Sequence, residues 1–194
     1  MFTAASLRLG AVTEKLTEQD IARALNLANA GDAQRASFHA PYVIPIADPM
    51  IEQLEVITEF RRFVLAAEEE IKGGNWVLGR GGYDSKGRSL RDLLRPMTGQ
   101  VTVRVRLRFH PLNNYHVVPP VDILLGDPTL LPTAATRTPN YAPRSEPGSV
   151  LVILGAVVDV SFNAPTIDDR SLPVRLMLEG TEIARAQVDF SRFE

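Results

Sequence analysis

Cysteine is absent from this chain of 194 residues. Its absence excludes disulfide bonds, thiol catalysis, cysteine-ligated zinc and iron–sulfur clusters. Lysine is scarce, because 18 of the 21 basic residues are arginine. Together with abundant alanine, this bias is typical of a GC-rich bacterial genome, so a bacterial origin explains most of the arginines without assigning them a task.

Long apolar runs are also missing. No stretch approaches the roughly 20 apolar residues that a membrane-spanning helix needs, so no membrane span is expected. The first 12 residues lack the basic segment followed by an apolar one that marks a signal peptide. The compartment stays open: a cytoplasmic location, or a periplasmic or exported one if a signal peptide was removed.

Neither strong charge nor a catalytic motif is present. The net charge of −2 gives no electrostatic reason to expect nucleic acid or an anionic membrane as the main partner. There is no P-loop, GxGxxG, HExxH, GxSxG or EF-hand pattern, and GRGG at residues 79–82 has the wrong spacing for a phosphate-binding loop. We therefore expect no cofactor and favour a non-enzymatic protein.

One stretch does stand out, QVTVRVRLRFH at residues 100–110. Its odd-numbered positions are apolar: Val101, Val103, Val105, Leu107 and Phe109. Its even-numbered positions are polar or basic: Thr102, Arg104, Arg106, Arg108 and His110. Successive side chains of a strand leave on opposite faces, so this alternation predicts a half-buried strand with a basic outer face.

The part of the chain before this strand favours helices. Thr17 is an expected N-cap, and helical spacing follows it to about residue 29. Residues 37–46 contain two prolines and are predicted to be extended, as an edge strand or a loop. Apolar periodicity predicts a helix over 59–72, whereas residues 52–58 fit both a helix and a strand.

Two shorter features complete this part of the chain. Residues 75–88 contain several glycines and turn signals, which predict a surface loop. Ser89 is then the expected N-cap of a short helix over residues 90–95.

The part after residue 110 favours antiparallel strands. Residues 115–125 are expected to return beside residues 100–110 as a hairpin. The proline-rich segment 126–149 is expected to be irregular. Residues 149–162 predict a central strand with a bulge or bend at Gly155.

A second hairpin is predicted near the end of the chain, with strands over 172–178 and 182–190 joined at Glu179-Gly180. The predicted fold class is therefore α+β, with N-terminal helices packed on a C-terminal antiparallel β-sheet or β-sandwich. One domain is expected over residues 1–194, with a helix-rich part at 1–98 and a β part at 99–194.

The arginine ladder is the main candidate site. Guanidinium groups suit carboxylates, phosphates and sulfates, so Arg104, Arg106 and Arg108 predict a face for an anionic ligand or acidic partner. The alternative is internal pairing, because three arginines about 7 Å apart repel one another unless acids lie between them. The candidate internal acids are Glu52, Glu55, Glu59, Asp122, Asp159 and Asp189.

The three histidines, His39, His110 and His116, form the second candidate set. His110 and His116 flank an expected turn, and a third ligand such as His39 or Asp122 would complete a metal site. Residues 38–45 and 109–119 both read Phe-His, a proline, then tyrosine and valine. This similarity has two explanations: the two segments run side by side, with Tyr115 and the histidines in a shared pocket, or it arose by chance in a chain rich in arginine, proline and valine.

Three functional hypotheses follow. The leading one is a non-enzymatic binding or assembly module, whose arginine face meets a protein partner or an anionic small molecule. The alternative is a metal-dependent, hydrolase-like enzyme that uses the histidines. The second alternative is nucleic-acid binding through the arginines, which predicts a steep loss of affinity with salt. In style the sequence resembles exported bacterial proteins in general, without a diagnostic motif.

Overall fold

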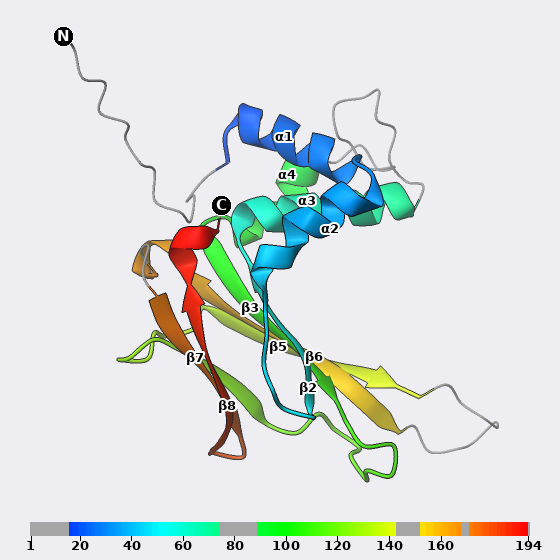
Figure 1. Cartoon of the computed structure of the whole chain (residues 1–194), viewed down its shortest axis with the longest axis vertical. Helices are drawn as coiled ribbons and strands as arrows, with labels where there is room; N and C mark the ends of the chain where they lie inside the picture. The colour runs from blue at the N-terminus through cyan, green and yellow to red at the C-terminus, as the bar shows by residue number, and fades with distance from the viewer. Residues whose placement is uncertain (1–15, 74–88, 143–151, 168–170, 194) are drawn as a thin grey trace.

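The computed structural model describes residues 16–73, 89–142, 152–167 and 171–193. Helices gather at one end of the molecule, and the strands extend away from them (Figure 1). Helices dominate the first half of the described chain and strands the second. The predicted α+β class is therefore confirmed. The end of the strands farthest from the helices is called the distal end below.

The helical end contains four α-helices in the described part of the chain. They are α1 (Glu18–Ala28), α2 (Asp32–His39), α3 (Glu59–Lys72) and α4 (Leu90–Leu94). The predicted start of α1 is confirmed, because the Thr17 hydroxyl accepts the backbone N–H of Asp20 and the Asp20 carboxylate accepts that of Thr17. Thr58 and Ser89 cap α3 and α4 through their hydroxyls.

The strands form two antiparallel sheets. The larger has the order β1-β2-β3-β6-β5, and the smaller has the order β4-β7-β8. The larger sheet consists of β1 (Val43–Ile44), β2 (Ile51–Ile57), β3 (Gln100–Arg108), β6 (Ile153–Asn163) and β5 (Ala134–Tyr141). The smaller sheet consists of β4 (Val121–Leu125), β7 (Ser171–Leu178) and β8 (Thr181–Asp189).

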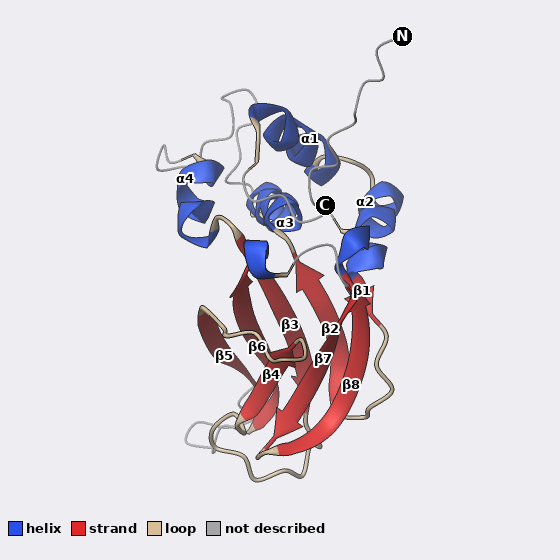
Figure 2. Cartoon of the chain, turned by 90° about the vertical axis from the view of Figure 1, so that its left-hand side faces the viewer, coloured by secondary structure: helices blue, strands red, loops and turns tan. Residues whose placement is uncertain are grey.

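The two sheets pack face to face beneath the helices as a β-sandwich (Figure 2). One core joins them, with Val103 and Val158 from the larger sheet and Leu176 and Val188 from the smaller sheet fully buried. Fully burying one such side chain contributes roughly 1.5–3 kcal/mol. Of the two architectures that the sequence allows, the structure therefore has the sandwich, with the helices over one end.

The alternating strand is confirmed as β3. Its apolar side chains, Val101 to Phe109 at every second position, are all buried in the sandwich core. Its polar side chains lie on the opposite surface, which we call the outer face of the larger sheet. The predicted β7–β8 hairpin is also confirmed, with Glu179 and Gly180 at φ +50° and +81°.

The hairpin predicted between residues 100–110 and 115–125 is wrong. β3 pairs with β2 on one side and with β6 on the other, so it has no free edge for a third strand. Residues 109–120 instead cross to the smaller sheet, where β4 pairs with β7. Pro119 and Pro120 offer no backbone N–H for a ladder, which favours this crossing.

The extended conformation predicted for residues 37–46 is largely wrong. Helix α2 continues to His39, and Ala40–Tyr42 form a 3₁₀ turn with Pro41 in its first turn, where its missing N–H costs no hydrogen bond. The extended strand in this region is confined to β1. Residues 51–57 form strand β2. The sequence left residues 52–58 open between helix and strand, and all of them except Thr58, the N-cap of α3, belong to the strand.

The irregular segment predicted at 126–149 is wrong over 134–141, which forms edge strand β5 beside β6. Pro139 is tolerated there because an edge strand has one unpaired side. The rest of that prediction beyond residue 142 and the loop predicted at 75–88 fall outside the described residues. None of the helices in the described ranges combines the length and apolar character needed to cross a bilayer.

Gly155 lies where the backbone of β3 leaves no room for a side chain on β6. A Cβ atom on this residue would stand 2.2 Å from the backbone oxygen of Leu107, which is too close for any side chain. The ladder with β5 also shifts register at Asn140 and Tyr141, opposite Gly155 and Ile153. The predicted irregularity at Gly155 is therefore confirmed in the ladder with β5, while the close approach of β3 requires a residue without a side chain at this position.

We expect Gly155→Ala to lower the free energy of unfolding by about 2–4 kcal/mol, because backbone rather than a flexible side chain must move. Urea denaturation measures this change. Gly31→Ser is the control, since a Cβ there meets nothing within 4 Å and serine is a good N-cap for α2. Equal stability of the two variants would contradict the close approach of β6 to β3.

Candidate functional site

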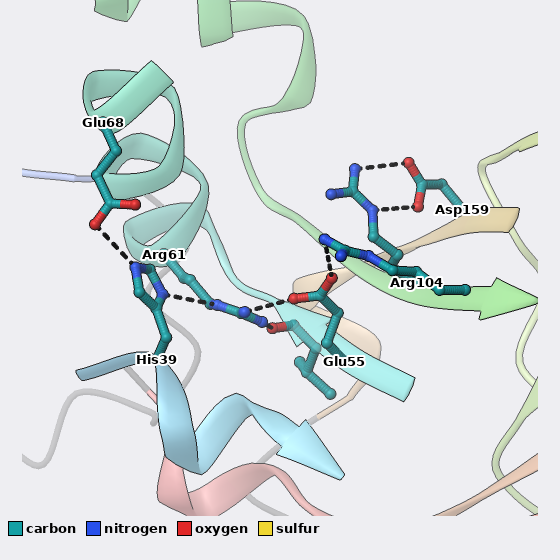
Figure 3. A network of polar contacts seen from close by, with 8 residues as sticks. His39, Glu55, Arg61, Glu68, Arg104 and Asp159 are labelled. Carbon is teal, nitrogen blue, oxygen red and sulfur yellow. Dashed lines mark hydrogen bonds and ion pairs between the residues drawn. The ribbon is translucent and has the colours of Figure 1, made fainter. Parts of the chain in front are cut away.

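An ion pair between Arg61 and Glu55 lies buried where α3 meets the larger sheet (Figure 3). Glu55 is on β2 and Arg61 is in the first turn of α3, and their residues are 3% and 2% exposed. Arg61 donates to Glu55 Oε2 and to the backbone oxygen of Val56, each at 2.5 Å. Burial lowers the pKa of Arg61, and Glu55 opposes that effect.

His39 extends this pair toward α3 (Figure 3). Arg61 Nε donates to His39 Nδ1 at 3.4 Å, so the neutral ring carries its proton on Nε2. That Nε2 lies 3.0 Å from Oε1 of Glu68 and donates to it. His39 therefore holds α2 against α3, which is a structural role.

Arg62, the next residue, fixes the start of β3. It donates to the backbone oxygens of Met97 and Gln100 and to the hydroxyl of Thr102. Burial lowers the pKa of Arg62, and the carboxylate of Glu59 opposes this. Both arginines of α3 are thus committed to internal partners.

Arg104 has an internal partner as well. It lies directly opposite Asp159 of β6, and its Nε and Nη2 donate to the two carboxylate oxygens at 2.7 and 2.9 Å (Figure 3). These hydrogen bonds raise the pKa of Arg104 above its ordinary value. A two-bond pair of this kind satisfies the guanidinium, so Arg104 is not an open anion site.

Arg106 is only loosely paired. Its Nη2 lies 3.7 Å from Oε1 of Glu55, which is too long for a hydrogen bond, and that oxygen has no hydrogen-bond partner. Nearly half of the Arg106 side chain, 47%, is exposed. Its cross-strand neighbours are Gln53 of β2 and Val157 of β6, so neither offers a charge.

Arg108 has no acidic partner in the part of the chain that the structure describes. It lies opposite Gly155 on β6, which has no side chain, and its backbone N–H donates to the oxygen of Met50. The side chain is exposed. The strand register therefore gives Arg104 a full ion pair and Arg106 only a distant carboxylate. Arg108 has no acidic partner among the described residues.

Arg108 also lines a mostly apolar cleft of about 420 Å³ at the distal end. We call it the distal cleft, and its lining includes Pro49, Met50, Arg108, Phe109, His110 and Tyr115. Tyr115 packs edge-on against Phe109, with ring centroids 5.1 Å apart. Three of the seven predicted site residues, Arg108, His110 and Tyr115, thus meet in one place.

The turn that forms one side of the cleft is held by Asn113. Its side-chain amide donates to the backbone oxygens of His110 and Ile153, and its own oxygen accepts the N–H of Tyr115. On the other side, the Asp48 carboxylate accepts the N–H of Met50 at 2.8 Å. Both walls are therefore fixed before any ligand arrives.

His110 presents a donor at this cleft. Its Nδ1 accepts the backbone N–H of Leu112 at 3.1 Å, so the neutral ring carries its proton on Nε2. The cleft thus combines apolar walls with a guanidinium and an imidazole N–H, a set suited to a ligand that joins an anionic group to an apolar one.

Two other cavities are less suited to an anion. One of about 570 Å³ lies between α1, α3 and α4, where the carboxylates of Glu59 and Asp92 line it together with Arg62, Arg91 and Arg95. One of about 490 Å³ lies on the outer face, where the carboxylates of Glu52 and Asp159 line it together with Arg104 and Arg106.

The histidines do not converge as the metal hypothesis requires. His39 lies at the helical end, whereas His110 and His116 lie in the segment after β3 at the distal end (Figure 1). The segments 38–45 and 109–119 are therefore not side by side, and the predicted shared pocket is wrong. The described residues contain no group of three histidine or acidic side chains placed to hold a metal ion. His116 is exposed outside the cleft.

Sequence analysis missed the buried role of Arg61, Arg62 and Glu68. It did name Asp159 and Glu55 among the possible internal acids of the ladder, and both lie next to it. A usable signal was the pair Arg61-Arg62 on the apolar side of a helix, because buried arginines require partners.

We expect Glu55→Ala to lower the free energy of unfolding by about 3–5 kcal/mol, because the buried charge of Arg61 then has no compensating carboxylate. Urea denaturation measures this loss. Glu182→Ala removes an acid from an exposed pair with Arg185 and is the control, with no resolvable change expected. Wild-type stability of Glu55→Ala would show that the pair does not hold α3 to the sheet.

Comparison of the chain with protein-family models, with curated proteins and with solved structures finds no match.

Proposed function

We propose that this chain is a binding or assembly module that recognises an anionic ligand or an acidic partner at the distal end of its arginine face. The observation that carries the proposal is the state of Arg108, which is exposed, lies opposite Gly155 and has no acid paired with it among the described residues.

An unpaired guanidinium at this position favours anion binding for a physical reason. It keeps its five N–H donors available and matches a carboxylate or phosphate with two parallel hydrogen bonds. Arg106 follows on the same face about 7 Å away and adds positive charge, since Glu55 neutralises it only from 3.7 Å. The apolar walls of the distal cleft adjoin the charge, so a ligand that fills the cleft displaces water on that side of the guanidinium and strengthens the pairing.

We expect Arg108→Gln to weaken binding of benzoate about 10- to 100-fold, because the substitution removes a charge-assisted contact. Its free energy of unfolding should stay within about 0.5 kcal/mol of the wild type, because the exposed side chain of Arg108 makes no hydrogen bond or ion pair to another described side chain. NMR titration with benzoate, and separately with inorganic phosphate, at constant ionic strength measures the binding.

Arg185→Gln is the matched control, because it removes the same charge from an exposed side chain on the smaller sheet. It should leave both titrations unchanged. If neither anion shifts any resonance of the distal cleft in the wild type, the proposed function is wrong.

Arg106→Ala is expected to weaken benzoate binding by less than Arg108→Gln, because Arg106 lies outside the distal cleft and acts through its charge. A small change in the thermal unfolding midpoint should accompany it. A sharp fall in that midpoint would instead make Arg106 a structural partner of Glu55.

A further inference from the structure

We propose that the distal cleft binds the C-terminal end of a polypeptide, with the terminal carboxylate on Arg108 and an apolar last side chain between Met50, Phe109 and Tyr115. This proposal rests on the proposed function above and names its ligand.

The composition of the cleft sets the chemistry of the ligand. Its walls are proline, methionine and aromatic side chains, with Arg108 as its guanidinium and His110 as its imidazole. About 420 Å³ is small for a folded element but accommodates one or two side chains. The ligand must therefore carry its negative charge beside an apolar group.

A chain terminus meets this requirement directly. Its carboxylate and its last side chain leave the same Cα atom, so both reach a guanidinium and an apolar wall that adjoin each other. An internal aspartate or glutamate must instead carry the main chain past the site in both directions. Capture of a terminal carboxylate is also an established mode of peptide recognition.

Two exposed apolar side chains point to a polypeptide rather than a small carboxylate. Leu112 and Val117 are 87% and 75% exposed in the segment that forms one wall of the cleft. A ligand that fills the cleft alone leaves both in water, whereas the residues preceding a bound terminus can cover them. Residues 109–120 contain no acidic side chain, so nothing in this segment repels an anionic chain end.

The cleft is also prepared for binding. The hydrogen bonds of Asn113 and Asp48 hold its two walls, so binding does not pay for ordering them.

The test uses a fluorescent hexapeptide ending in leucine-phenylalanine, made as the free acid and as the C-terminal amide, with fluorescence polarisation as the measurement. We expect the free acid to bind at least about 10-fold more tightly than the amide, since the amide loses the charge-assisted contact. Arg108→Gln should remove this difference. Leu112→Ser should weaken binding of the peptide and leave binding of benzoate unchanged.

Leu131→Ser is the control for Leu112→Ser, because Leu131 is 88% exposed but lies in the β4–β5 connection. Equal affinities of the acid and the amide would overturn the proposal. If benzoate binds as tightly as the peptide, and Leu112→Ser changes neither affinity, the proposal of a polypeptide ligand is overturned. The proposed anion-binding function would then still stand. If peptide, benzoate and phosphate all fail to bind, both proposals fall.

Discussion

The buried pair of Glu55 and Arg61 is the interaction on which the arrangement of helices and sheets depends. It joins the end of β2 to the first turn of α3, at a point where neither side chain reaches water. Burying both charges is costly, and removing one partner costs more than the pair contributes, so the two residues require each other. His39 and Tyr42 complete this site. The Arg61 guanidinium donates a hydrogen bond to His39 and lies over the ring of Tyr42.

This constraint also decides how the arginines divide between structure and binding. Glu55 serves Arg61 first, so it reaches Arg106 only at 3.7 Å. Asp159 lies in register with Arg104, and two residues further along each strand Val157 lies opposite Arg106. Among the described residues, positive charge is therefore neutralised near the helices and has no acidic partner at the distal end, next to an apolar cleft. One strand thus supplies both the core of the sandwich and the anion-binding face that we propose.

The sequence predicts well whatever depends on local periodicity. The alternation of β3, the cap of α1, the bounds of α3 and the turn at Glu179-Gly180 follow from positions a few residues apart. It fails where tertiary pairing decides. The hairpin after β3 is wrong because strands distant in sequence fill both edges of β3, and β5 forms despite Pro139 because β6 offers an edge. Likewise, the open state of Arg108 depends on a register that no single segment encodes.

The most direct test of this division is the ¹⁵N–¹H spectrum of the arginine side chains, recorded as benzoate is added. We predict slowly exchanging Nε–H signals for Arg61 and Arg104 that do not move, because each Nε–H donates a hydrogen bond to another side chain of the protein. We predict that the Nε–H signal of Arg108 exchanges rapidly at first, then shifts and sharpens as benzoate is added. A shift of the Arg104 signal together with an unchanged Arg108 signal would contradict an anion site at Arg108.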